Sequence, residues 1–331
     1  MTVRVTAPAK NVREELSKLN KPSGVAGEAM LRAETPQEQF NLIGAGRKNL
    51  IINGGFLISQ RGSFTTASSA TDTAYSVDRF KNFVKVVTAD VQHTKATTVD
   101  GVLKSTLKMT ATSTASGRLG IRQYIEADST KVPYAGQIVT LSVWMKSNNT
   151  DAGLYIYDYG NTGYYYRTKH SGSGEWEKLT LTFPMSTGNV TQNGYGVELN
   201  FAMQSDVNGS VNIATGDYVE IAEPQLELGS VATPFEHRSY GEELALCQRY
   251  YESGSIYAFG ARISPYHENR RFAAIYFRVS KRTTPTVTAT VGFDAAGTVN
   301  SVIGHIDMMR VYSLDTSSYM TVSGFTADAE L

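Results

Sequence analysis

The chain has 331 residues, of which 41% are hydrophobic, and its 31 Lys and Arg residues balance its 31 Asp and Glu residues. A domain usually has about 100 to 200 residues, so this length predicts two globular units and an additional segment. The formal net charge of zero gives no overall attraction to nucleic acid or to an anionic membrane. We therefore expect neither as a partner.

The hydrophobic stretches are all short. None approaches the ~20 continuous apolar residues of a membrane-spanning helix, and the start of the chain lacks the apolar run of a secretory signal. The single cysteine, Cys247, excludes an intrachain disulfide bond and agrees with folding in a reducing cytoplasm. We expect a protein that folds where it is made, with the thiol of Cys247 buried.

Residues 1–46 differ in pattern from the rest of the chain. Val12, Leu16 and Leu19 have helical spacing before proline and glycine residues interrupt the segment, and a second short helix is predicted over 36–42. Such an arm is too small to enclose a core, so it either stays disordered or becomes ordered against another chain. The three apolar residues favour the second alternative and are candidates for an anchor.

Alternating hydrophobicity dominates residues 47–237. The clearest segments are Gln137–Lys146, Lys178–Phe183 and Tyr195–Gln204, in which apolar residues occupy every second position. Turn-forming clusters of Gly, Asn and Ser separate these segments. The pattern predicts an antiparallel jelly-roll sandwich in which each strand has one buried face.

The period changes near residue 238. Leu244, Cys247 and Tyr251 have helical spacing, and Ser239 with Glu242 could form a capping box. Alternation then resumes in the last ~80 residues, which predicts a C-terminal β domain over 238–331, preceded by this short helix. A β domain of this size often depends on a partner to bury enough surface, so we expect an oligomer.

Several segments together resemble a known family. They are NLIINGGFLISQRG (49–62), YSVDRF (75–80), PQLELGSVATPFEHRSYGEELALCQRYY (224–251) and the terminal FTADAEL (325–331). They are similar to bacteriophage virion fibre and tail-appendage proteins, in which a jelly roll similar to carbohydrate-binding modules precedes a C-terminal β domain. The resemblance implies a homotrimer that is held on the virion by its N-terminal end, with the β domains facing the host. Members commonly have tryptophan at the positions of Ser59 and Phe80, so the resemblance extends to architecture more than to any glycan contact.

Tyrosines form a row in the predicted hairpin around residue 160. Leu154 and Ile156 share one face of its first strand, and the tyrosines occupy the opposite face and the returning segment: Tyr155, Tyr157, Tyr159, Tyr164, Tyr165 and Tyr166. Such a row can stack on sugar rings and form hydrogen bonds, or its members can pair across strands or at a subunit interface. Trp144 lies on the polar face of its own strand and is a further stacking candidate or the cover of a sheet edge, whereas Trp176 is expected in the core.

Metal and catalytic signatures are weak. The five histidines are scattered, so no zinc site is expected; turn residues such as Asn148, Asn149, Asp151, Asp206 and Asn208 suit either calcium or ordinary turns. The carboxylate pairs Glu126 with Asp128 and Asp158 with Asp151 fit glycosidase acids in type, but strand and turn carboxylates are usually solvated. A basic group suits either an acidic polysaccharide or a solvated sheet edge: Arg270, Arg271, Arg278, Lys281 and Arg282. We expect no metal, no cofactor and no enzymatic activity.

The main hypothesis is a trimeric tail fibre or spike of a virion, assembled in the host cytoplasm. Residues 1–46 would attach to other virion proteins, and the β domains would recognise the host surface, with a glycan as the ligand. One alternative is a capsid-decorating or adaptor protein with a purely assembly role. The other is a hydrolase of surface polysaccharide. The strip from Ile221 to Glu252 is expected to be a structural joint, with Ile221 near the end of the last jelly-roll strand and Pro224 and Gly229 at its exit.

Overall fold

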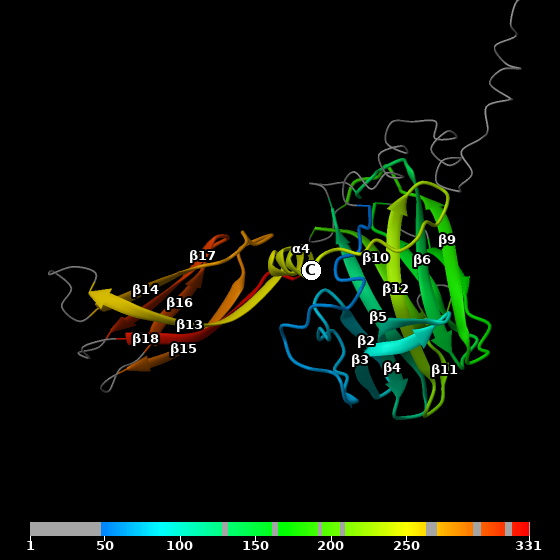
Figure 1. Ribbon diagram of the computed structural model, residues 1–331, viewed down its shortest axis with the longest axis horizontal. Coiled ribbons are helices and arrows are strands. Elements are labelled where there is room, and N and C mark those ends of the chain that lie inside the picture. Colours follow the sequence, from blue (N-terminus) through cyan, green and yellow to red (C-terminus); the bar gives the residue numbers. More distant parts are fainter. Residues whose placement is uncertain are drawn as a thin grey trace, which may run out of the picture. The chain divides into compact units, whose positions relative to one another are not determined.

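The computed structural model describes residues 48–127, 132–160, 165–190, 194–205, 209–262, 270–293, 299–314 and 320–330. Its contacts divide the chain into two compact units, Met1–Lys48 and Asn49–Leu331. The described residues form three antiparallel β-sheets and the helix α4 (Tyr240–Gln248), which confirms the expected all-β class (Figure 1). The domain bounds 47–237 and 238–331 stay a prediction, and the anchor candidates Val12, Leu16 and Leu19 lie outside the described residues.

The first sheet has the strand order β1-β3-β4-β12-β6-β9. Alternate residues of β6 point into the core, as the pattern predicts, and four of them are buried: Val139, Leu141, Val143 and Met145. The strands are β1 (Ser68–Ser69), β3 (Ala89–Val99), β4 (Val102–Ala111), β12 (Tyr218–Leu228), β6 (Ile138–Ser147) and β9 (Trp176–Pro184).

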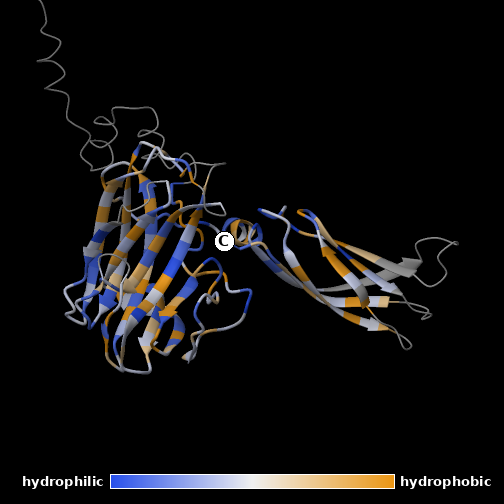
Figure 2. Ribbon diagram, turned by 180° about the vertical axis from the view of Figure 1, so that it is seen from behind, coloured by the Kyte–Doolittle hydropathy of each residue, from blue (hydrophilic) through white to orange (hydrophobic). Residues whose placement is uncertain are grey.

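The second sheet has the order β11-β5-β10-β7-β8, and β2 also pairs with β5. Its strands are β11 (Val211–Ile213), β5 (Ala115–Glu126), β10 (Tyr195–Met203), β7 (Ala152–Asp158), β8 (Tyr165–Lys169) and β2 (Lys81–Lys85). Inward residues of both sheets, such as Leu107, Ile121 and Leu199, form one continuous core. Hydrophobic and hydrophilic segments alternate along these strands in Figure 2. The sandwich therefore follows from the period-two pattern, because one face of each sheet is removed from water.

His93 is an unusual member of this core. Its ring is 4% exposed, packs edge-on against Phe56, and its Nε2 atom has no hydrogen-bond partner. Burial, with the charge of Lys95, lowers the pKa of His93 below the ordinary histidine value. The folded state thus holds the neutral imidazole.

The pKa of His93 predicts acid sensitivity. Below about pH 6.5 the unfolded chain binds a proton that the folded chain does not, so stability falls with pH by up to about 1.4 kcal/mol per pH unit until the folded pKa is reached. We expect His93→Phe to remove this part of the loss when urea unfolding is compared at pH 7.5 and pH 5.5. The control substitution His305→Phe, at an exposed position, should leave this loss of stability unchanged. Equal pH dependence in the wild type and in His93→Phe would contradict the prediction.

The third sheet has the order β15-β18-β13-β14-β17-β16 and its own small core, which includes Ile275, Val311 and Val322. Its strands are β13 (Tyr251–Arg262), β14 (Arg270–Tyr276), β15 (Thr286–Phe293), β16 (Val299–Gly304), β17 (Met308–Leu314) and β18 (Met320–Asp328). None of the helical segments in the described part of the chain has the length and hydropathy of a membrane span.

Helix α4 begins as predicted. The Ser239 hydroxyl accepts a hydrogen bond from the Glu242 amide, and the Glu242 carboxylate accepts one from the Ser239 amide, which completes the capping box. Cys247 is fully buried, also as predicted, and burial raises the pKa of its thiol well above the ordinary value. The thiol is therefore protonated and unreactive at neutral pH.

The exit from the sandwich differs from the expectation. Strand β12 continues to Leu228, so Ile221 lies in its first half and Pro224 lies inside the strand. The pairing with β6 shifts register between Ala222 and Gln225, and Glu223 has a φ of 51°. A bulge of this kind accommodates a proline because it interrupts the ladder of hydrogen bonds. Gly229, with a φ of 107°, does end the strand.

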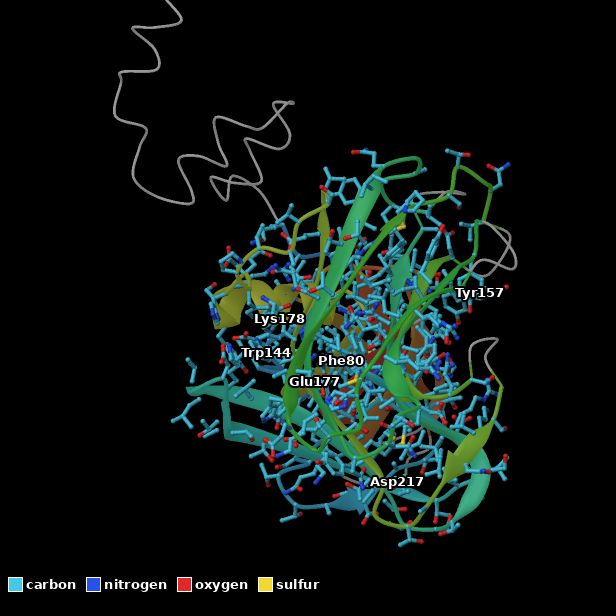
Figure 3. The ribbon with its side chains drawn as sticks, turned by 90° about the vertical axis from the view of Figure 1, so that its right-hand side faces the viewer. Phe80, Trp144, Tyr157, Glu177, Lys178 and Asp217 are labelled. Carbon is cyan, nitrogen blue, oxygen red and sulfur yellow. The ribbon has the colours of Figure 1, made fainter. Side chains whose placement is uncertain are left out.

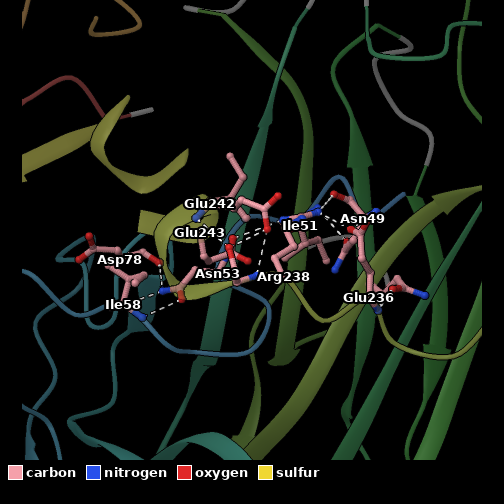
Figure 4. A network of polar contacts seen from close by, with 12 residues as sticks. Asn49, Ile51, Asn53, Ile58, Asp78, Glu236, Arg238, Glu242 and Glu243 are labelled. Atoms are coloured by element: carbon pink, nitrogen blue, oxygen red, sulfur yellow. Dashed lines mark hydrogen bonds and ion pairs between the residues drawn. The ribbon is translucent and has the colours of Figure 1, made fainter. Parts of the chain in front are cut away.

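The recognisable segments of the sequence meet in space. Arg238, from the strip before α4, donates hydrogen bonds to the backbone oxygens of Asn49 and Ile51 and pairs with Glu236 and Glu243 (Figure 4). The Asn53 amide donates to Glu243. The first segment is thus fastened to the helix by buried polar contacts.

The same joint also includes Asp328 and Glu330. Arg79 is 2% exposed, pairs with Glu330, and lies 3.5 Å from the ring centroid of Tyr250. Arg61 pairs with Glu330 at 3.2 Å and with Asp328 at 3.3 Å. Four segments that are far apart in the sequence therefore form one polar joint, in which their polar side chains form hydrogen bonds and ion pairs with one another.

Candidate functional site

The outward side of the second sheet carries an unusual layer of side chains. Cross-strand pairing brings together Lys81, Arg122, Asn200, Tyr155 and Arg167, one from each of five adjacent strands. We call the outward side chains of β2, β5, β10, β7 and β8 the Arg122 face. Arg167 is exposed at one edge and Lys81 is half-buried at the other, whereas Asn200 in the middle is 4% exposed.

Polar groups in the middle of the Arg122 face are incompletely satisfied. Arg122 Nη1 lies 3.3 Å from Glu198 Oε1, and the hydroxyl of Tyr159 donates to Glu198 Oε2 at 2.7 Å. Arg122 Nε and Asn200 Oδ1 are buried and have no hydrogen-bond partner, and neither has Gln204 Oε1, directly after the end of β10. A buried donor or acceptor without a partner costs about 1 to 3 kcal/mol, so a bound molecule that supplies the partners is favoured.

Aromatic rings surround these polar groups. Tyr124 stacks on Tyr195 with 4.5 Å between centroids, and Tyr157 meets Tyr159 edge to face at 4.6 Å. The guanidinium of Arg122 lies 4.8 Å from the ring centroid of Phe83. Burial, together with the charge of Glu198, raises the pKa of Tyr159, so its hydroxyl remains a donor at neutral pH. Of these rings, Phe83 and Tyr124 are buried, and Tyr124, Tyr159 and Tyr195 pack in the cluster that contains Cys247 and Tyr250. The half-buried Tyr157 is the ring that can stack on a sugar, beside groups that can bind the sugar's hydroxyls.

Small residues lie next to this cluster. Gly120 of β5 pairs with Ala202 of β10, and a Cβ atom on Gly120 would stand 2.3 Å from the Cβ of Ala202. Glycine is required there because the two strands approach closely.

The predicted tyrosine row is divided by the structure. Tyr157 and Tyr159 lie on the outward side and are half-buried, which keeps them as candidates. Tyr155 as a glycan contact is wrong: it is 0% exposed, and its hydroxyl donates to the backbone oxygens of Asp151 and Gln204. Tyr166 is also wrong, because it points inward and stacks on Phe183 at 4.9 Å. Tyr164 and the side chain of Tyr165 lie outside the described residues.

The two tryptophans lie on the outward side of the first sheet. Trp144 pairs with Lys178, and Trp176 pairs with Lys146, so the two indoles are diagonal neighbours. Both are half-buried, which corrects the core placement of Trp176. Figure 3 shows Trp144 and Tyr157 on opposite sides of the sandwich. Trp144 therefore remains a stacking candidate but cannot join the same platform as the tyrosines.

Other candidate residues have structural partners. Glu126 binds Arg249 and Tyr250, and Asp158 accepts hydrogen bonds from Gly160 and Ser186. Lys281 is wrong as part of a basic surface, because its ammonium is buried and pairs with Glu252 at 2.7 Å. The side chains of Arg270 and Arg271, and Asp128, Asp206 and Asn208, lie outside the described residues. Within the part of the chain that the structure describes, no group of three or more His, Cys, Asp or Glu side chains suits a metal ion.

A hollow of about 210 Å³ lies beside the joint, lined by residues that include Leu57, Leu103, Phe235 and His237. Ligand pockets usually measure about 300 to 1,000 Å³. We therefore treat the Arg122 face as the better candidate.

Some solved structures are similar to part of this chain. No protein-family model and no curated protein matches the chain. Among solved structures, a cyclase from Fischerella sp. TAU is 13% identical, with 57% of this chain and 100% of that chain covered and a TM-score of 0.36. A module, TmCBM61, solved with β-1,4-galactotriose, is 15% identical, with coverages of 55% and 100% and a TM-score of 0.30.

A tailspike protein of bacteriophage CBA120 is also similar. Its enzymatically active domain is 15% identical, with a TM-score of 0.33, and the match covers 54% of this chain but only 21% of that one. These TM-scores are too low to support an inference about ligand or activity. The candidate site therefore depends on its own geometry.

Proposed function

We propose that the chain is a structural, non-enzymatic protein of a virion appendage, and that it binds a host-surface glycan through the Arg122 face. The observation that supports binding is the pair of unpartnered atoms, Arg122 Nε and Asn200 Oδ1, beside outward aromatic rings. A sugar hydroxyl both donates and accepts, so one hydroxylated ligand can satisfy both atoms while its C–H face packs on Tyr157.

The assembly part of the proposal draws on the sequence resemblance. Residues 1–46 would attach to other virion proteins, and three copies of the chain would associate. The four recognisable segments form the joint near Arg79 and Arg238. They therefore support a shared architecture, and the proposed ligand site lies elsewhere, on the face of a sheet. A capsid-decorating or adaptor role remains the alternative. Immunogold labelling confined to capsid faces of intact particles would favour it.

Binding to a printed array of bacterial surface polysaccharides tests the glycan proposal. We expect Tyr157→Ala and Asn200→Ala each to weaken binding about tenfold, because each removes a contact worth about 1 to 1.5 kcal/mol. Titration calorimetry with the best polysaccharide of the array gives the affinities, and near-UV circular dichroism verifies the fold.

Trp144→Ala is the matched control, because it truncates an aromatic residue on the outward side of the other sheet. Its affinity should stay within about twofold of the wild type. If Trp144→Ala abolished binding and Tyr157→Ala did not, the Arg122 face would be the wrong site. Release of reducing ends from the bound polysaccharide would contradict the non-enzymatic part.

A further inference from the structure

We infer that copies of this chain contact one another through the outward side of strands β14, β16 and β17 in the third sheet. We call the outward side chains of these strands the Arg310 face: Ala274, Tyr276, Ile303, Met308 and Arg310. The inference rests on the association of copies in the proposed function and adds the place where they meet.

These three strands carry apolar residues on both of their sides. Their inward residues belong to the core of the third sheet: Ile275, Met309 and Val311. On the other side, Tyr276 lies opposite Met308, and Ile303 lies opposite Arg310. Tyr276 is 70% exposed and Ile303 is 44% exposed. Strands with apolar residues on both sides are typical of sheets that are covered on both faces, so a partner is expected to cover this one.

The outward side of β15, in the same sheet, has a different composition. Thr286, Thr288 and Thr290 alternate there and are all exposed. The hydroxyls of Thr288 and Thr326 share a hydrogen bond of 2.7 Å and can also bond to water. One half of the sheet is thus suited to water, whereas the Arg310 face collects exposed apolar side chains, as interaction surfaces do.

Arg310 lies in the middle of this apolar face. Its neighbours across the strands are Ala274 and Ile303, and its Nε atom is buried and has no hydrogen-bond partner. Among the residues that the structure describes, none forms an ion pair with Arg310. A purely apolar partner would bury this charge without compensation, which is unfavourable. The partner is therefore expected to present an anion together with an apolar side chain.

The chain itself presents such a combination in the turn between β16 and β17. Ile306 is 49% exposed, and the neighbouring Asp307 is also exposed. The Oδ1 atom of Asp307 accepts a hydrogen bond from the Ser280 hydroxyl, and its carboxylate does not pair with Arg310 of the same chain. An apolar residue beside a carboxylate complements Ile303 beside Arg310. The turn of one copy therefore fits the Arg310 face of the next copy.

This contact joins two different surfaces, which makes it a head-to-tail contact. Such contacts form a closed ring when the rotation between neighbouring copies closes, and a ring of three agrees with the proposed function. The second copy is the occupant that both the apolar residues and the charges favour.

Sedimentation velocity of the full chain over a wide range of concentration tests the surface. We expect the wild type to form an oligomer of defined size, and Ile303→Glu and Tyr276→Glu each to weaken association about thirtyfold or more, because each places a charge in a buried apolar contact. Thr290→Glu is the matched control, since it adds the same charge on the outward side of β15, and its association should stay within about twofold of the wild type. Thermal unfolding followed by circular dichroism verifies that each variant is folded.

Charge exchange tests the pairing of Arg310 with Asp307. Arg310→Glu and Asp307→Arg should each weaken association about tenfold or more, and the double variant should recover most of the loss, because it restores the attraction with the signs reversed. A double variant as weak as the sum of the single changes would refute this pairing.

The outcomes separate the surface from the rest of the proposed function. A wild type that stays monomeric at every concentration would overturn both this inference and the assembly of three copies, while glycan binding would stand. Association that persists unchanged in Ile303→Glu, Tyr276→Glu and Arg310→Glu would overturn the Arg310 face alone. An equal loss in Thr290→Glu would point to general repulsion of charge and would also count against this surface.

Discussion

Glu330→Gln is expected to lower the free energy of unfolding by about 3 to 5 kcal/mol, although it changes a residue one position from the end of the sequence. Its carboxylate is 4% exposed and pairs with Arg79 and Arg61. Arg79 also donates to the Tyr124 backbone oxygen at 2.8 Å and packs on Tyr250, so the guanidinium cannot move into water. The substitution leaves a buried positive charge without its nearest anion.

Urea unfolding followed by circular dichroism measures this loss. Asp72→Asn is the matched control, because the Asp72 and Lys85 side chains are 25% and 42% exposed and a pair of that kind contributes about 0 to 1 kcal/mol. The double substitution with Arg79→Met should recover part of the stability, because it removes the charge that was left alone. A loss below about 1 kcal/mol for Glu330→Gln would show that the tail does not stabilise the joint.

Arg238→Met is expected to have a comparable effect, about 3 to 5 kcal/mol. The guanidinium is 7% exposed and neutralises Glu236 and Glu243 while it donates to the backbone oxygens of Asn49 and Ile51. Without it, two largely buried carboxylates repel each other and two carbonyl groups lose their donors.

Hydrogen exchange gives this second prediction a local readout. The Asn53 amide donates to Glu243, so its protection should decrease more than that of amides in the third sheet. Arg238→Lys should retain only part of the stability, because an ammonium cannot reproduce the fork of donors. Equal stability of Arg238→Lys and wild type would mean that charge alone maintains the contact, and equal stability of Arg238→Met would refute the role of the network.

The joint is made of the segments that carry the sequence resemblance. Its residues, among them Asn53, Arg79, Arg238 and Glu330, are buried and bound to one another. They connect the sandwich with helix α4 and with residues 328–330. None of these four residues lies on the Arg122 face, so the resemblance concerns the joint and not the candidate site.

Local patterns of the sequence were sufficient to predict several elements of secondary structure. Alternation in Gln137–Lys146 and Tyr195–Gln204 placed β6 and β10 and their buried faces, because side chains of a strand point to opposite sides. Ser239 and Glu242 placed the start of α4, because a capping box involves residues only three positions apart.

The candidate site could be predicted only in part. Alternation put Glu198 and Asn200 on the polar side of β10, but it gave no reason to pair them with Arg122 and Tyr157. That juxtaposition depends on the register of β10 with β5 and β7, which long-range packing sets. Tyr155 was a wrong candidate for a related reason. Both faces of β7 are buried at this position, and the Tyr155 hydroxyl donates to the backbone oxygen of Gln204, a residue that only the fold brings close.

The sequence by itself therefore determined the all-β class, the faces of the main strands and the capped helix, since each depends on neighbours within a few residues. The tertiary structure decided which strands lie side by side, that Arg79 and Glu330 meet, and that Arg122, Lys81 and Asn200 share one surface. Charge and hydrogen bonding act over a few ångströms in space, whatever the separation along the chain. Only the folded arrangement brings these groups within that distance.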